Sequence, residues 1–109
     1  MRYAAKIDRN QPEIVAALRD VGASVEPLHR VGKGCPDLLV GFRGVNYLLE
    51  VKDGELAPSD RKLTKAQAEW LPAWRGSATV VLSADEALKA IGVDCYRDLR
   101  DRVVGKDVL

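Results

Sequence analysis

Three charged residues stand within two apolar segments near the middle of the chain. Asp37 opens the first apolar run, and Glu50 and Lys52 interrupt the second. Mg²⁺ prefers oxygen ligands and keeps several waters, so one or two carboxylates from a protein are enough to hold it. A lysine ammonium group beside them can stabilise negative charge on a phosphate. The pattern therefore predicts a metal site beside a bound phosphate, with Asp37, Glu50 and the backbone carbonyl of Val51 as ligands and Lys52 as the electrostatic catalyst.

A structural ion pair is the alternative explanation of the same residues. A Glu-x-Lys sequence on a strand usually belongs to a solvated face. Here Glu50 and Lys52 interrupt a segment that is apolar at the positions of both faces. Charge is costly to bury unless it is paired or used, so this setting favours the metal site over the ion pair.

A tight turn is predicted to bring the two carboxylates together. Arg43-Gly44 separates the two apolar runs, and two-residue loops of this kind connect the strands of β-hairpins. With these residues as the loop, Asp37 lies directly opposite Glu50 on one face of the sheet, with Cβ atoms about 5 Å apart. A register shift of one residue would put the two carboxylates on opposite faces.

The remaining pattern predicts a single α/β domain over residues 1–109, with about four strands and several helices. Asn10 is expected to cap the first helix, with Glu13 completing a capping box. Pro72 is expected to break or kink the second helix before its end. Apolar residues at both sets of alternating positions favour a sheet covered on both faces. The expected order is a helix, three strands, a helix, a strand, a helix and an extra C-terminal helix, over residues 10–22, 23–28, 37–42, 45–52, 64–76, 79–82, 83–91 and 94–104.

The composition excludes several classes of protein. A formal net charge of +1 gives no global positive field of the kind that marks a passive nucleic-acid coat. Two cysteines without a C-x-x-C or His/Cys pattern exclude a disulfide framework and a zinc site of that kind. No apolar leader opens the chain, and no run approaches the length of a membrane helix. The expected compartment is a reducing cytoplasm.

The ordered motifs are similar to those of a known family. Pro36-Asp37, in a Gly-x-Gly-x-Pro-Asp loop, and Glu50-Val51-Lys52 match the two signature motifs of the PD-(D/E)XK nuclease superfamily. An early helix bearing Glu13 precedes them, and Leu63 to Gln67 resembles the family segment Leu-(Ser/Thr)-x-x-Gln. The chain most resembles the virus-type replication-repair nuclease (VRR-NUC) group and, more distantly, archaeal Holliday junction resolvases.

This resemblance implies a restriction-endonuclease-like core, with a central mixed sheet of about four strands flanked by helices. It also implies an Mg²⁺-dependent endonuclease that hydrolyses DNA, with Mn²⁺ able to substitute. It adds Glu13 as a further catalytic and metal-binding residue and Gln67 as a further catalytic residue. Each has a plainer alternative, a capping-box acid for Glu13 and an exposed polar helix residue for Gln67. One such domain has one catalytic centre and would nick one strand, so action on both strands of duplex or branched DNA predicts a homodimer. A free-standing nuclease of this size is typical of phages and mobile elements. A non-catalytic nucleic-acid-binding module that keeps the nuclease fold is the competing function.

Two basic clusters flank the motifs, one before Asp37 and one before Gln67. They are expected either to contact a nucleic-acid backbone or only to keep the surface soluble. Their members are Arg30, Lys33, Arg61, Lys62 and Lys65.

Two tryptophans, Trp70 and Trp74, are spaced by one helical turn in the second predicted helix. Large aromatic side chains at this spacing are typical of a core or a subunit contact, and stacking on bases is the alternative. The sequence favours the core or the subunit contact.

Overall fold

A tight hairpin lies at the centre of the fold. It joins β2 (Leu38–Phe42) to β3 (Val45–Val51) through Arg43 and Gly44. Both turn residues have positive φ, 52° and 81°, as a type I′ turn requires, and this turn matches the right-handed twist of paired strands. Pairing of the first residue of β2 with Leu49 confirms the predicted register, which continues outward to Asp37 and Glu50.

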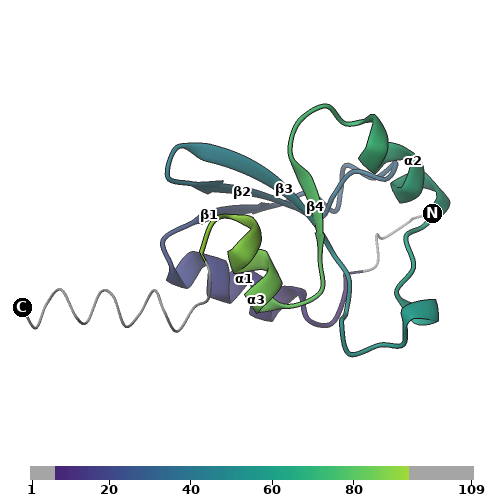
Figure 1. Cartoon of the computed structure of the whole chain (residues 1–109), viewed down its shortest axis with the longest axis horizontal. Coiled ribbons are helices and arrows are strands. Elements are labelled where there is room, and N and C mark those ends of the chain that lie inside the picture. Colours follow the sequence, from purple (N-terminus) through teal and green to yellow (C-terminus); the bar gives the residue numbers. More distant parts are fainter. Residues whose placement is uncertain (1–6, 94–109) are drawn as a thin grey trace, which may run out of the picture.

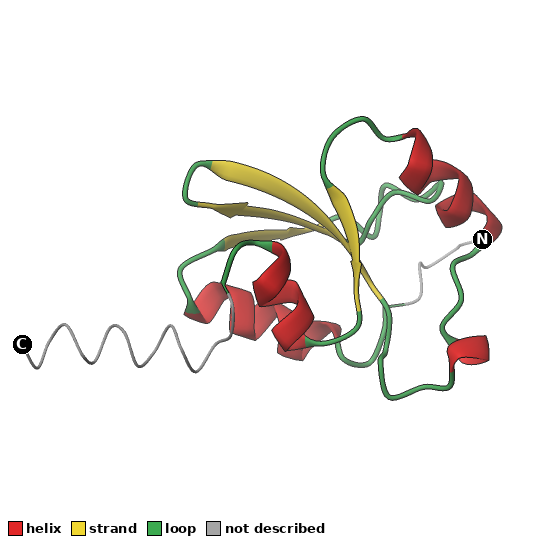
Figure 2. Ribbon diagram, in the orientation of Figure 1, coloured by secondary structure: helices red, strands yellow, loops and turns green. Residues whose placement is uncertain are grey.

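Two further strands complete a mixed sheet in the order β1-β2-β3-β4 (Figure 2). β1 (Ser24–Pro27) pairs antiparallel with β2 at one edge, and β4 (Ala78–Val81) pairs parallel with β3 at the other. The computed structural model describes residues 7–93, so the helix expected over 94–104 lies outside the described residues. The described part is an α/β domain with a four-stranded mixed sheet, as the sequence predicts.

Helices are distributed unevenly about this sheet (Figure 1). α1 (Gln11–Asp20) packs against α3 (Ala84–Ala90) and β1, and α3 packs against β4, so both helices cover the same face. α2 (Lys65–Ala73) lies over one end of the opposite face, after a loop that contains a short 3₁₀ turn, η1 (Pro58–Asp60). The core lies between these two helices and the sheet. Its fully buried side chains include Ile14, Leu18, Leu38, Val40, Leu49, Val51 and Leu88.

The two faces of the sheet therefore differ in burial. On the core face Leu38, Leu49 and Val51 are inaccessible to solvent. On the other face Leu39 and Val80 keep 36% and 37% of their surface exposed. The expectation of a sheet covered on both sides is wrong for this second face, because α2 reaches only one end of it. Asp37 and Glu50 alternate with the core residues along β2 and β3, so they belong to this open face.

Local signals placed the helix ends correctly in some cases and not in others. The side chain of Thr64 accepts from the backbone N–H of Gln67 and the Gln67 side chain accepts from the N–H of Thr64, a complete capping box at the start of α2. Pro72 lies inside the last turn of α2, which ends one residue later.

No helix within residues 7–93 is long and apolar enough to cross a membrane.

The capping box predicted for α1 is wrong. Asn10 occupies the N-cap position but makes no side-chain cap hydrogen bond. Its amide instead donates to the carbonyls of Lys52 and Leu82, each at 3.1 Å. These carbonyls lie one residue past the ends of β3 and β4, where backbone hydrogen bonds still join the two segments. Tertiary packing thus lets the Asn10 side chain hydrogen-bond residues far away in the sequence, and it joins the ends of the two strands.

Candidate active site

Asp37 is fixed at the point where the hairpin ladder ends. β3 extends past the start of β2, so the backbone N–H of Val51 faces a position where β2 offers no ladder carbonyl. The carboxylate of Asp37 accepts that N–H through Oδ2 at 2.7 Å. In an extended strand the N–H and C=O of one residue point to the same side, so the Val51 carbonyl is directed toward Asp37 as well.

Glu50 presents a buried carboxylate beside Asp37. Only 1% of its surface is exposed. Oε2 accepts from Nε2 of Gln67 at 2.9 Å and lies 3.7 Å from Nζ of Lys52. Oε1 is buried and has no hydrogen-bond partner among the described residues. A carboxylate oxygen buried without a donor is unfavourable unless a cation or water binds it.

The pKa of Glu50 is raised to about 8; burial is the largest cause, and the neighbouring carboxylate of Asp37 is the second. The ammonium group of Lys52 acts in the opposite direction, and the carboxylate of Asp8 adds to the increase. Two carboxylates facing each other in a buried place repel, so one of them holds its proton more tightly. A divalent cation between them would remove this repulsion.

Gln67 holds Glu50 and Lys52 in a fixed relation. Its Oε1 accepts from Nζ of Lys52 at 2.8 Å and from the N–H of Thr64 at 2.9 Å, while its Nε2 donates to Glu50. The capping box fixes the Gln67 side chain at the start of α2, and the same amide then binds both charged groups of β3. The Lys52 ammonium group is thus directed toward Glu50 without forming a close ion pair with it.

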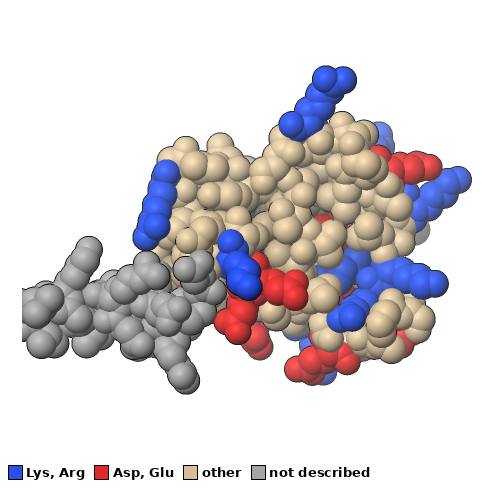
Figure 3. Space-filling view, viewed as in Figure 1, with Lys and Arg blue, Asp and Glu red and all other residues tan. Residues whose placement is uncertain are grey.

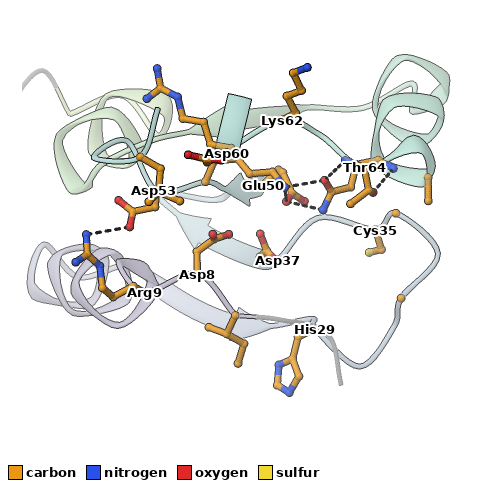
Figure 4. A pocket seen from close by; sticks show the side chains of 18 of the residues that line it. Asp8, Arg9, His29, Cys35, Asp37, Glu50, Asp53, Asp60, Lys62 and Thr64 are labelled. Carbon is orange, nitrogen blue, oxygen red and sulfur yellow. Dashed lines mark hydrogen bonds and ion pairs between the residues drawn. The ribbon is translucent and has the colours of Figure 1, made fainter. Parts of the chain in front are cut away.

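These side chains line a cavity of about 870 Å³ on the open face of the sheet, which we call the site cavity (Figure 4). Its walls come from β3, from the loops on either side of the hairpin and from the start of α2. Four of the catalytic residues predicted from the sequence lie in it together: Asp37, Glu50, Lys52 and Gln67.

Glu13 is not among them. It is exposed on α1 and lines a separate hollow with Arg9, Asp53 and Glu86. α1 packs against the core face of the sheet through Ile14 and Leu18, and Glu13 lies on the exposed side of this helix. It is therefore directed away from the open face. The structure therefore does not bring Glu13 to Asp37, and its predicted metal-binding and catalytic roles have no support from its position.

Asp8 reaches the site cavity from the same N-terminal region (Figure 4). Its carboxylate shares the cavity with those of Asp37 and Glu50, close enough to Glu50 to raise the pKa of that group. The next residue, Arg9, forms ion pairs with Asp53 and Glu55 at 3.0 and 2.9 Å, which tether this segment to the loop after β3. Asp8 precedes any periodic pattern, so no local signal in the sequence singles it out.

Three of the five predicted basic residues line the site cavity, and two do not. Lys33, Arg61 and Lys62 are lining residues, whereas Arg30 and Lys65 are exposed and lie outside the lining. Figure 3 shows basic side chains gathered on the side of the molecule where α2 and the loop after β3 lie, with acidic groups interspersed. The cavity lining thus includes basic side chains that could contact phosphates, together with an equal number of acidic ones.

A glycine sets the distance between the loop before Asp37 and α2. Gly34 has a φ of +85°, and a Cβ placed there would overlap the Ala66 carbonyl, lying 2.6 Å from its carbon atom. The loop therefore touches the backbone of α2 directly, one residue before Gln67. We call this the Gly34–Ala66 contact; it sets the position of Gln67 relative to Asp37.

The residues of the site cavity suit a hard divalent cation with few protein ligands. Within residues 7–93, no group of three or more His, Cys, Asp or Glu side chains is arranged to hold a metal ion. Mg²⁺ needs only one or two carboxylates and fills its other positions with water and substrate oxygens. Asp37, Glu50 and the Val51 carbonyl meet that need, and the unpartnered Oε1 of Glu50 is the observation that favours such an ion.

Comparisons of the chain with protein-family models, with curated protein sequences and with solved structures each gave no match.

Proposed function

We propose that this chain is an Mg²⁺-dependent endonuclease of the PD-(D/E)XK type that hydrolyses DNA phosphodiester bonds, with a restriction-endonuclease-like core. The single observation that carries the proposal is the geometry of Glu50. Its carboxylate is buried opposite Asp37, one oxygen has no partner, and the ammonium group of Lys52 stands 3.7 Å from the other oxygen. A purely structural ion pair would have no need of the second, facing carboxylate.

Each residue has a distinct part in this proposal. Asp37 and Glu50, with the Val51 carbonyl, would hold Mg²⁺, and Mn²⁺ is expected to substitute. When bound, the ion would neutralise phosphate charge and lower the pKa of a water molecule. Lys52 offsets the negative charge that develops on the phosphate oxygens. Gln67 keeps that ammonium group beside Glu50, where the reacting phosphate would bind.

The expected substrate and assembly follow from the same site. Lys33, Arg61 and Lys62 at the rim would bind the phosphates flanking the cleaved bond. One site cavity cuts one strand, so cleavage of both strands of a duplex or a junction calls for a two-fold dimer. We propose a homodimer acting on duplex or branched DNA, in the cytoplasm of a bacterial cell or of a phage-infected one.

The test is incubation with supercoiled plasmid and with a four-way junction in Mg²⁺, Mn²⁺ or EDTA. We expect cleavage with either metal and none in EDTA, and Asp37→Asn should lower the rate at least about 100-fold. Asp85→Asn, which removes an exposed carboxylate on α3, is the matched control and should cleave normally. Cleavage that persists in EDTA or in Asp37→Asn contradicts the proposal. Binding of Mg²⁺ without cleavage of any DNA would favour the non-catalytic module instead.

A further inference from the structure

A second hollow lies beside the site cavity on the open face of the sheet. It has a volume of about 840 Å³, and its walls include Leu39, Leu48, Trp70 and Trp74. We call it the tryptophan groove. Its size is within the range of small-molecule sites, about 300–1,000 Å³. Its apolar floor is the part of the sheet that no helix covers.

The two tryptophans form an open aromatic wall and not part of the core. Their rings stack with centroids 4.8 Å apart and planes 15° from parallel. Trp74 keeps 47% of its surface exposed, so it does not lie in the core, and the expected subunit contact stays a prediction. Gly76 leaves room for the indole, because a Cβ there would lie 2.8 Å from Nε1 of Trp74. The ring is therefore held in place while one side of it faces solvent.

The groove and the site cavity are adjacent and share residues. Gly32, Lys33 and Cys35 line both, on either side of the Gly34–Ala66 contact. α2 runs along both hollows, with Gln67 in the first and Trp70 in the second, and Trp74 follows the helix as its C-cap residue. At about 1.5 Å per residue, Trp70 and Trp74 lie roughly 4.5 and 10.5 Å further along the helix direction than Gln67. A nucleic-acid strand advances by roughly 3.4 Å per stacked nucleotide, so bases roughly one to three nucleotides from the cleaved bond would reach the tryptophans.

The charge of the groove suits a polyanion with apolar, planar groups. No carboxylate lines it among the described residues, and Lys33 stands at the boundary with the site cavity. Aromatic side chains beside a cation are the usual platform for unpaired bases. A second copy of the chain is the competing occupant, which the test below distinguishes from nucleic acid.

We infer that the tryptophan groove binds unpaired nucleobases next to the cleaved phosphodiester bond. This inference rests on the proposed function, and it narrows the substrate to DNA with a single-stranded segment at the site. Bases within an intact duplex are paired and stacked and cannot enter the groove. Trp74 supplies the stacking surface, and Lys33 binds the phosphate between the two hollows.

The test compares the binding of three labelled probes by fluorescence anisotropy in EDTA, where the proposed hydrolysis cannot proceed. The probes are an oligothymidylate of about 12 nucleotides, an abasic strand of equal length and the matching duplex. We expect the oligothymidylate to bind most tightly and to quench tryptophan fluorescence. Trp74→Ala should weaken its binding on the order of 5- to 150-fold and leave the abasic strand unaffected. Trp74→Phe should keep most of the preference.

Val45→Ala is the matched control, because this side chain is 48% exposed at the hairpin turn and outside the groove. It should bind all three probes as the unmodified protein does. Equal binding of oligothymidylate and abasic strand overturns the inference, and so does a Trp74→Ala protein that retains the preference. Sedimentation showing that Trp74→Ala only dissociates a dimer would overturn it too, in favour of a self-interface.

The outcomes separate this inference from the proposed function. Cleavage with Mg²⁺ but without any preference for unpaired bases would contradict the inference about the groove and support the proposed nuclease function. A preference for oligothymidylate that depends on Trp74, with no cleavage of any DNA, would support base binding by the groove and contradict the proposed nuclease function.

Discussion

The amide of Gln67 donates to Oε2 of Glu50 at 2.9 Å while its oxygen accepts the ammonium group of Lys52 at 2.8 Å. One neutral side chain thus separates a buried carboxylate from its nearest cation and holds both. Because the ammonium group is shared with Gln67, it does not fully neutralise Glu50. Glu50 therefore keeps negative charge that an additional cation can bind, whereas a close ion pair with Lys52 would leave little.

Replacement of Gln67 should affect activity more than stability. Gln67→Ala removes both hydrogen bonds to β3 as well as its half of the capping box, and we expect cleavage to fall about 10- to 100-fold. Thr64→Ala is the control, since it removes only the hydroxyl that caps α2 and should cost about 1 kcal/mol of stability. Rates measured beside urea unfolding distinguish the two effects. Equal losses of activity in both variants would mean that Gln67 acts only as a helix cap.

Removal of the Lys52 charge should slow the reaction without loss of the metal. Lys52→Met keeps the length of the side chain, and we expect the rate to fall about 100- to 1,000-fold. Mg²⁺ affinity measured by calorimetry should stay equal or increase, because a cation that competes for Glu50 is gone. Lys89→Met on α3 serves as the control for loss of one positive charge. Loss of Mg²⁺ binding in Lys52→Met would show that the lysine holds the site together rather than assisting the reaction.

Without metal, the folded protein should lose stability as the pH rises. The pKa of Glu50 is about 8 in the folded chain against an ordinary value of 4.5, so the folded state binds more protons between these pH values. The free energy of unfolding therefore decreases as the pH rises through this window. Calorimetry in EDTA should show a melting temperature that falls across this window, by on the order of 20 °C for the full shift.

Glu50→Gln should lack this dependence and melt higher than the unmodified protein at pH 8, because its neutral amide needs no proton. Added Mg²⁺ should restore the unmodified protein at pH 8 and have little effect on Glu50→Gln. Glu26→Gln, on the exposed part of β1, should keep the original profile. Parallel profiles for the unmodified protein and Glu50→Gln would refute the assignment to this residue.

The Gly34–Ala66 contact should tolerate no side chain. Gly34→Ala would force a left-handed backbone on alanine and would push α2 away from the loop, so we expect a loss of about 2–4 kcal/mol and a large loss of cleavage. Gly32→Ala provides the comparison, because Gly32 also has a positive φ of 70° but has no neighbour within 4 Å of an added Cβ. It should cost only about 1–2 kcal/mol. Urea unfolding of the two variants measures the difference, and equal values would exclude a role for the contact.

Residues close in the chain were the ones that could be placed from the sequence. The two-residue turn at Arg43 and Gly44 fixes the hairpin register, and the register alone puts Asp37 opposite Glu50. Alternation along β3 then puts Lys52 on the same face. Backbone geometry and side-chain period are local properties, which is why the order of elements and the hairpin could be predicted from the residues. The mixed sheet was implied only by the family resemblance, because the parallel pairing of β4 with β3 joins segments far apart in the chain.

Contacts between distant segments were decided only by tertiary structure. Packing of α1 under the core face exposes Glu13 and leaves Asp8 in the site cavity, and it draws the Asn10 amide away from its helix to two strand ends. The position of α2 joins Gln67 to two charged groups and leaves Trp74 open to solvent. Each of these outcomes depends on where a whole helix packs, and no local pattern encodes that, because helix docking minimises the exposed apolar surface of the entire domain.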